Sequence, residues 1–298
     1  MKNLKIIIAA MISVLLCGCA SSAGNAPIAA TTLPVWEFTS RLCAGTPITV
    51  TRLVTEQVSC LHDYSLNVRQ VKAAESAETI VISGAGLEDF LDDLLLTADV
   101  IDASEGIPLL CGEAHEEEHE EKHEEEHEAG HHHEEDPHIW LAPENAKVMA
   151  RNICTGLSDR YPQYRKTFED NLDGLLMDLD ALQNYGKDTL SGLPCRNLIT
   201  FHDGFAYFAD AFGLTILKAV EEESGSEASA RDLIELITLV QEQSLPAIFT
   251  ESSGSASAAG IIARETGCGV FTLDMAMAGD SYFDAMYHNI DTIKEALG

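Results

Sequence analysis

The chain has 298 residues, of which 49 are acidic and 18 basic, so its formal charge at pH 7 is −31. This length is enough for two lobes with a buried core. The composition argues against nucleic acid as a partner, because phosphates would repel so acidic a protein. An acidic surface instead suits cations, although solubility alone is the simpler interpretation.

Residues 1–18 have the pattern of a lipoprotein signal peptide. After a basic start, the apolar run Ile6–Leu16 is too short to span a membrane as a mature helix. The sequence LCGC that ends at Cys19 resembles a bacterial lipobox, in which the Cys19 thiol takes a diacylglyceryl group. A plain secretory signal is the alternative. We therefore expect an extracytoplasmic protein, anchored to the bacterial cell membrane by lipid, with residues 19–27 as a flexible tether.

Predicted strands and helices alternate through the first half of the chain, which indicates a parallel sheet covered on both faces. The strands are β-branched or apolar runs, often closed by glycines, and the helices between them are amphipathic. We expect strands at Ile28–Thr32, Ile48–Val54, 79–86 and 100–107, and helices at 33–45, Val68–Ala77 and 87–98. The loop at 55–66 carries His62.

A long one-sided helix, Tyr164–Gly186, follows a helix that opens at Pro143, and it has no strand beside it. We interpret it as a stiff connector, because the alternation resumes after it. Further strands are expected at 196–201, 214–220, 245–252 and 269–274, and helices at 204–213, Arg231–Gln243 (capped near Ser229), 255–267 and 281–297. The prediction is an α/β protein with an N-terminal lobe at 28–160, a connecting helix at 161–192 and a C-terminal lobe at 193–298.

Residues 113–135 form a His/Glu-rich stretch with no apolar side chain larger than alanine. We expect it to be disordered without metal, because it has nothing to bury and its glutamates repel one another. Its imidazoles would serve as an auxiliary cation trap; they are His115, His119, His123, His127, His131, His132 and His133. Overlapping matches to the H-E-x-x-H metalloprotease pattern are rejected, since that chemistry needs a packed helix and a third ligand.

Three histidines outside this stretch and one aspartate share a context. His62, His202 and Asp274 each follow a predicted strand, and His138 precedes a helix. In open α/β sheets ligands bind beyond the carboxyl ends of the strands. The spacing gives two of these residues to each lobe, so an interlobe cleft would close over one ion. Three imidazoles and a carboxylate suit zinc, whereas Mn(II) favours more oxygen ligands.

Each of these residues also has an ordinary interpretation. A histidine after a strand is often a loop residue bonded to backbone, and an aspartate there is often a turn or helix-capping residue. Glu251, at the end of a predicted strand, is either a substitute ligand or a partner for an imidazole N–H. Whether Asp274 or Glu251 completes the site stays open at this point.

Six cysteines follow the proposed lipidation site Cys19, and an even number outside the cytoplasm permits disulfides. None forms a CxxC pair, so a zinc site built from cysteines is not expected. Cys60 either pairs with Cys43 or lies free beside the metal, and we favour the disulfide. The other pairings stay open among Cys43, Cys60, Cys111, Cys154, Cys195 and Cys268.

Several phrases, taken in order, resemble those of the metal-binding lipoproteins of bacterial ABC importers. They read SCLHDYSL, DPHIWLAP, TFHDGFAYFADAFGL, AIFTESSGSASAAGIIARETG and VFTLD. The similarity is to the ZnuA/TroA-like family (cluster A-I), and it covers nearly the entire mature chain. It implies two α/β lobes joined by one long helix, with ligands at His62, His138, His202 and Asp274. Two departures are DYSLNVRQ after His62, where a Tyr-Glu-Pro phrase is usual, and Met275 where proline is common.

The resemblance implies a substrate-binding protein that captures Zn(II) and delivers it to an ABC permease powered by an ATPase. Histidine at position 202 and a His/acid-rich loop before DPHIW are similar to zinc members rather than manganese members. We expect a monomer that catalyses no reaction. The alternatives are a manganese-binding member, a zinc hydrolase, which would need a metal-bound water and a general base, and a surface zinc-storage or adhesion lipoprotein.

Overall fold

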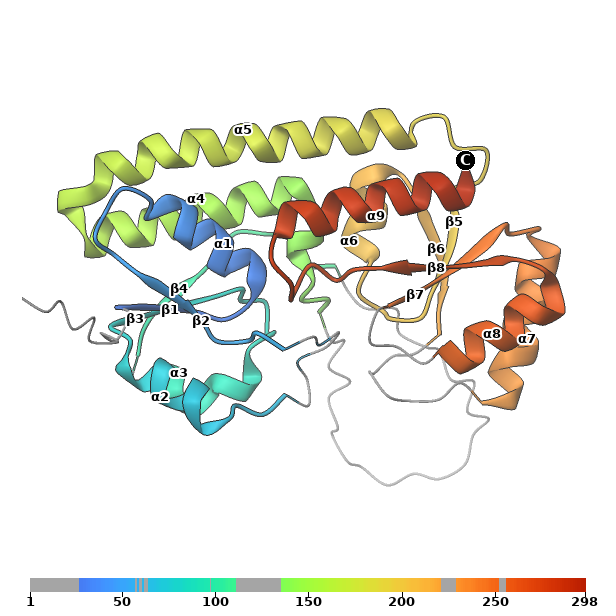
Figure 1. Ribbon diagram of the computed structural model, residues 1–298, viewed down its shortest axis with the longest axis horizontal. Coiled ribbons are helices and arrows are strands. Elements are labelled where there is room, and N and C mark those ends of the chain that lie inside the picture. The colour runs from blue at the N-terminus through green and yellow to red at the C-terminus, as the bar shows by residue number, and fades with distance from the viewer. Residues whose placement is uncertain are drawn as a thin grey trace, which may run out of the picture.

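The computed structural model describes residues 27–56, 58, 61, 64–96, 98–110, 135–220, 229–251 and 256–298. Two four-stranded parallel sheets, of order β2-β1-β3-β4 and β6-β5-β7-β8, lie at opposite ends of the molecule (Figure 1). The first contains β1 (Ile28–Ala30), β2 (Val50–Arg52), β3 (Thr79–Ile82) and β4 (Asp99–Asp102). The second contains β5 (Asn197–Thr200), β6 (Thr215–Ala219), β7 (Ala247–Glu251) and β8 (Gly269–Leu273). This confirms the predicted α/β fold of two lobes.

Some of the helices begin at residues whose side chains cap them. Asn67 caps the second helix with a reciprocal bond to Gln70, and Ser229 caps the seventh as predicted, accepting from Asp232 N at 3.2 Å. The N-terminal helices are α1 (Leu33–Leu42), α2 (Val68–Ser76), α3 (Asp92–Leu95) and α4 (Pro143–Arg160). They are followed by α5 (Arg165–Leu190), α6 (Ala206–Phe212), α7 (Ala230–Glu242), α8 (Ala256–Thr266) and α9 (Tyr282–Leu297).

Alternate residues of each sheet pack against different layers of helices. Ile28 belongs to a cluster shared with α1, α4 and α5, whereas Ala29 joins a smaller cluster with α2 and α3. In the second sheet Leu198 joins the shared cluster, and Ile199 packs with α7 and α8. Figure 1 shows these layers, with α4, α5 and α9 above the two sheets. Because one core runs through both lobes, large movements of one lobe against the other are disfavoured.

The connector predicted within 161–192, with its one-sided pattern over Tyr164–Gly186, corresponds to α5, a helix of 26 residues that ends at Leu190. Gly186 does not stop the helix. A Cβ at this position would clash with the ring of Phe212 in α6, so the glycine permits close packing of two helices. Asn171 binds the carbonyl of Leu42 at 2.8 Å and Tyr185 binds Asp291 of α9 at 2.6 Å, so α5 is attached to both lobes.

Two predicted elements are shorter than expected. The helix predicted at 87–98 consists of a single turn at Asp89–Leu91 and α3, because the Glu88 side chain turns inward and accepts from Ser83 N and Gly84 N. The strand predicted at 100–107 ends at Asp102, whose carboxylate accepts from the backbone and hydroxyl of Ser104 and turns the chain.

The structure contradicts the predicted pairing of Cys43, whose thiol is free. Cys43 ends α1 and is buried in the shared core, and burial raises the pKa of its thiol to about 12. Free thiols are also found at Cys154, Cys195 and Cys268, while Cys60 and Cys111 lie outside the described residues.

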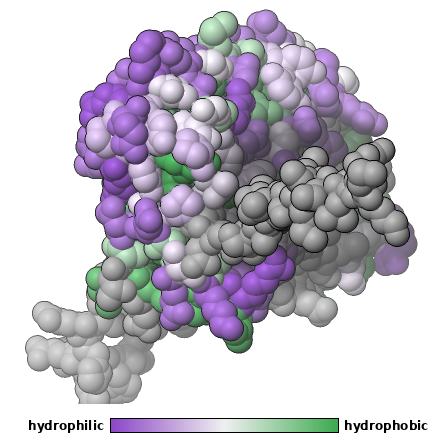
Figure 2. Space-filling view, turned by 60° about the vertical axis from the view of Figure 1, so that its left-hand side comes forward, coloured by the Kyte–Doolittle hydropathy of each residue, from purple (hydrophilic) through white to green (hydrophobic). Residues whose placement is uncertain are grey.

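The signal peptide, Cys19 and all seven histidines of the 113–135 stretch lie outside the described residues. In the part of the chain that is described, no helix combines the length and apolar character needed to cross a membrane. On the face shown in Figure 2, hydrophilic residues cover most of the described surface, and hydrophobic residues form small separate areas.

Candidate metal centre

His138 and His202 approach each other closely between the two halves of the chain. Their Nε2 atoms are 3.3 Å apart, although the residues are 64 positions apart in sequence, and the rings are nearly perpendicular at 87°. Both are buried, with 2% and 3% of their surface exposed. Two nitrogens bound ~2.05 Å from a tetrahedral zinc ion would lie about 3.3–3.4 Å apart, so the observed spacing fits two ligands of one ion.

The other nitrogen of each ring faces a carboxylate. His138 Nδ1 lies 2.7 Å from Asp136 Oδ1, and His202 Nδ1 lies 3.6 Å from Glu251 Oε1. A carboxylate that accepts from the Nδ1–H of an imidazole leaves the lone pair of that ring on Nε2, as in metal-ligating histidines. The 2.7 Å contact of His138 has the length of such a hydrogen bond, whereas the 3.6 Å contact of His202 is longer than one. Since the two Nε2 atoms face each other, a cation placed between them would accept a lone pair from each ring.

Asp136 is a residue that the sequence reasoning missed. Its Oδ1 also accepts from the backbone N of His138 at 2.9 Å, which closes a turn across Pro137. Its Oδ2 is buried without a hydrogen-bond partner among the described residues. The signal was present in the Asp-Pro-His phrase, because an aspartate before proline favours a turn in which the carboxylate reaches back to the residue two positions on.

His202 is placed by the end of β5 and by Gly204. Phe201 continues the strand by donating to Phe249 O at 2.9 Å, and His202 follows at the carboxyl edge of the sheet. A Cβ on Gly204 would lie 2.7 Å from His202 Cδ2 and 2.9 Å from its Nε2, so the absence of a side chain gives the ring its space. The Cβ built on Gly204 would also lie 2.7 Å from Met275 Cε, so Met275, the residue after Asp274, lies near His202.

Asp274 lies directly after β8 and is held by its neighbours. Its backbone N and O bind the side chain of Asn289 at 2.8 and 2.6 Å, and its Oδ1 accepts from Ala276 N at 2.7 Å. The indole of Trp140 donates to Met275 O at 2.7 Å, which ties this turn to the segment of His138. Among the described residues, no three side chains of the metal-binding types form one group, and His62 lies outside them.

Hydrogen bonds close the base of the loop that carries His62. Tyr64 OH donates to Glu56 Oε2 at 2.8 Å, and Gln70 Nε2 donates to Tyr64 OH at 2.6 Å. Burial, and then the bond to Glu56, raises the pKa of Tyr64 to about 12, so its hydroxyl stays protonated and keeps donating. Residues 56 and 64 are thereby held together on either side of His62.

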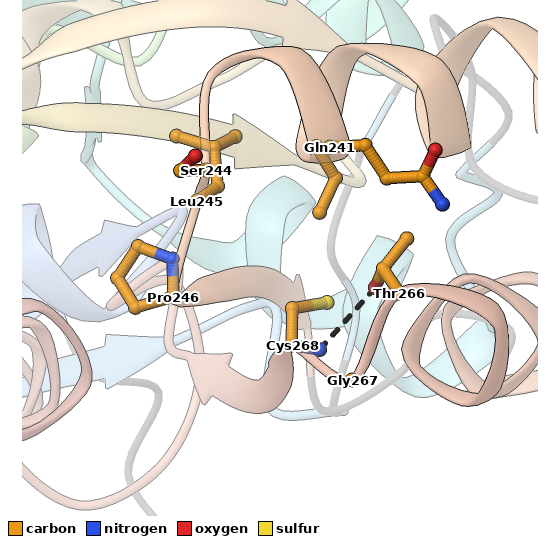
Figure 3. A pocket seen from close by; sticks show the side chains of 8 residues that line it. Gln241, Ser244, Leu245, Pro246, Thr266, Gly267 and Cys268 are labelled. Carbon is orange, nitrogen blue, oxygen red and sulfur yellow. Dashed lines mark hydrogen bonds between the residues drawn. The ribbon is translucent and has the colours of Figure 1, made fainter.

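A separate surface pocket of about 360 Å³ lies in the C-terminal lobe and is lined by residues around Pro246 and Cys268 (Figure 3). These residues immediately precede β7 and β8, so the pocket is at the amino ends of the strands. His202 and Glu251 lie at the carboxyl ends. The pocket is therefore not part of the histidine site.

Comparison with known proteins identifies the class. Residues 28–296 match the family described as ZnuA, the periplasmic component A of a zinc-uptake complex, and the chain belongs to this family. It is 30% identical, over 99% of its length, to the zinc-binding lipoprotein AdcA of Streptococcus pneumoniae, and it spans 61% of that relative. It is 26% identical to the manganese ABC transporter substrate-binding lipoprotein PsaA of Streptococcus mitis, with 79% of this chain and 78% of PsaA covered.

Solved structures show the same architecture. A crystal structure of ZnuA matches with a TM-score of 0.77 and 30% identity, covering 92% of this chain and 100% of that one. The Zn(II)-bound AdcA of Streptococcus pneumoniae matches with a TM-score of 0.73 and 27% identity, covering 91% of this chain and 57% of AdcA. The family predicted from the sequence phrases is thereby confirmed.

Proposed function

We propose that this chain captures Zn(II) outside the cytoplasm and passes it to an ABC permease driven by a cytoplasmic ATPase. The observation that carries the proposal is the pair of buried imidazoles whose Nε2 atoms face each other at 3.3 Å. The proposed ligands are His62, His138, His202 and Asp274. The chain itself makes and breaks no covalent bond in this process.

Zinc is favoured over manganese by the chemistry of the donors. Both approaching donors are imidazole nitrogens, and zinc accepts nitrogen-rich tetrahedral sets, whereas Mn(II) favours oxygen. Asp136 and Glu251 face the Nδ1 atoms, so we assign them to orienting the rings rather than to the ion. Zinc is also supported by relatives that are named zinc-binding, such as AdcA, while PsaA is a relative that is named as a manganese transporter component.

We further propose that residues 28–160 and 193–298 are the two lobes, and that residues 113–135 are an auxiliary metal-binding stretch. Cys19 would anchor the chain to the membrane through its lipid, as the lipoprotein names of AdcA and PsaA suggest. Since one core spans both lobes, release would depend on small shifts or on contact with the permease rather than on wide opening.

A competition titration with a zinc chelator tests this proposal. The mature chain and a variant lacking residues 113–135 would be compared, each with zinc and with manganese. We expect both proteins to retain one tight zinc site, and the full chain to bind additional zinc weakly. Loss of the tight site on deletion, or tighter binding of manganese than zinc, would contradict the proposal.

Uptake of zinc by cells tests delivery separately. The chain would be expressed together with its permease and ATPase in a strain that lacks other high-affinity zinc uptake. Zinc accumulation is expected with the native chain and not with His202→Ala, provided that both are present in equal amounts. Equal accumulation in the two strains would rule out delivery through this site.

A further inference from the structure

The hydroxyl of Tyr207 connects the segment that carries His138 with the helix that follows His202. Tyr207 belongs to α6, five positions after His202, and only 4% of its surface is exposed. Its hydroxyl donates to the backbone O of Asp136 at 3.1 Å and accepts from the backbone N of Leu110 at 2.9 Å. One side chain of the C-terminal half therefore binds two backbone segments of the N-terminal half, at Leu110 and at Asp136.

These two backbone segments are also bound to each other. Asp136 N donates to Leu110 O at 2.9 Å, so Leu110, Asp136 and the Tyr207 hydroxyl form a closed triangle of hydrogen bonds. Asp136 then binds both the backbone N and the ring Nδ1 of His138. A displacement of Asp136 would therefore be passed directly to the His138 ring.

We propose that Tyr207 is a positioning residue that sets the separation of the His138 and His202 imidazoles, and thereby the zinc affinity of the site. This inference rests on the proposed function. The connection forms a ring: Tyr207 holds Asp136, Asp136 orients His138, and His138 faces His202, which lies in the turn that leads into α6, the helix of Tyr207. Without the hydroxyl, the Asp136 carbonyl would be buried without this partner, and the segment would be free to move.

Tyr282 provides a matched control. It is fully buried in α9, and its hydroxyl donates to the backbone O of Trp140 at 2.8 Å. Both tyrosines thus bind a carbonyl of the same segment from the C-terminal half, but only Tyr207 binds the residue that orients His138. Replacing each by phenylalanine removes one hydroxyl from a buried site and leaves the ring in place.

The experiment compares Tyr207→Phe and Tyr282→Phe in the mature chain, by chelator competition for zinc and by the visible spectrum of the Co(II)-loaded protein. Loss of the direct partner of a metal ligand typically weakens binding by about 10- to 100-fold. Tyr207 acts one step further out, through Asp136, so for Tyr207→Phe we expect the lower end of this range, about tenfold, together with altered cobalt bands. For Tyr282→Phe we expect a change of at most about threefold and an unaltered spectrum. Saturating cobalt would keep a destabilised variant folded for the spectrum.

Native affinity and native cobalt bands in Tyr207→Phe would overturn the inference, as would an equal effect in Tyr282→Phe. His138→Ala, measured in parallel, separates a failure of the proposed function from a failure of the role proposed for Tyr207. If the native chain binds no zinc tightly, or His138→Ala binds it equally well, the proposed function fails. If only His138→Ala loses binding, the function stands and Tyr207 has no positioning role.

Discussion

The two sheets have the same strand order, and each has a buried acid at its carboxyl edge. In the C-terminal lobe Glu251 ends β7 and faces His202, which follows β5. In the N-terminal lobe Glu88 follows β3 and accepts from the hydroxyl of Thr31, which follows β1, at 2.7 Å. The two acids reach the carboxyl edge of their sheets differently, because Glu251 is the last residue of β7 whereas Glu88 lies in the loop after β3 and turns back toward the strand ends.

The difference lies in what each acid holds. Glu88 also accepts from Ser83 N at 2.7 Å and Gly84 N at 3.0 Å, so its oxygens are engaged by the backbone of its own loop. Glu251 is instead directed at an imidazole whose other nitrogen faces His138. The comparison teaches that the partners of the buried acid differ between the lobes: Glu88 is engaged by a hydroxyl and by backbone amides of its own loop, whereas Glu251 faces an imidazole that a metal ion could use.

The largest expected effect follows removal of an imidazole. His138→Ala and His202→Ala should each weaken zinc binding by more than about a hundredfold, which exceeds the usual cost of losing an outer partner. His288→Ala is the matched control, because His288 lies within α9 and its ring nitrogen contacts Thr292 of the same helix. Chelator competition would measure all three. Binding within tenfold of native in either site variant would contradict the assignment.

Glu88, the buried acid of the N-terminal lobe, should make the free energy of unfolding depend on pH. Burial raises the pKa of Glu88 from 4.5 to about 7, so between these values the folded chain holds a proton that the unfolded chain has lost. Its contribution to the free energy of unfolding is therefore present below pH 4.5 and is lost as the pH rises through 7, by roughly 3 kcal/mol. Denaturant unfolding of the metal-free native chain and Glu88→Gln, from pH 5 to 8, measures this difference. A difference that does not change with pH would refute it.

The two acids behind the imidazoles should differ in importance. Asp136→Ala removes a bond of 2.7 Å to the His138 ring and the turn that holds its backbone, and should weaken zinc binding by about 10- to 100-fold. Glu251→Gln changes a longer contact of 3.6 Å to His202, and its effect should be less than about tenfold. The reverse order in chelator competition would show that His202 depends more on its acid than His138 does.

An effect of a size similar to that of Glu251→Gln is expected at the glycine beside His202. Gly204→Ala places a methyl group within 3 Å of the imidazole, which must rotate, so zinc binding should weaken by about tenfold. Gly174→Ala is the control in α5, where the added Cβ meets no atom within 4 Å. That change should raise the free energy of unfolding by about 0.5–1 kcal/mol and leave zinc affinity unchanged. Unchanged affinity in Gly204→Ala would show that the ring has room to adjust.

Much of the fold could be predicted because buried parallel strands and one-sided helices leave clear patterns. The run around Thr79–Ile82 is apolar on both faces, and the connector has a single apolar side. The helix predicted at 87–98 was wrong in length, since the inward turn of Glu88 depends on tertiary bonds to the ends of two strands.

For the candidate site, the sequence pointed to the two histidines but not to the residues that position them. Strand ends and family phrases pointed to His138 and His202, but the distance between them arises from the packing of both lobes around a shared core. Asp136 and Tyr207 were missed because their roles depend on hydrogen bonds to specific backbone atoms. The expected disulfide of Cys43 was wrong, because even cysteine numbers do not show which thiols are enclosed in the core.

The most direct measurement is zinc X-ray absorption on the variant lacking residues 113–135, loaded with one equivalent of zinc, with and without His202→Ala. We predict nitrogen and oxygen ligands at about 2.0–2.1 Å from the zinc with strong imidazole scattering, and the loss of one imidazole when His202 is replaced. A shell that contains sulfur, or a spectrum that His202→Ala leaves unchanged, would show that zinc is not held between His138 and His202.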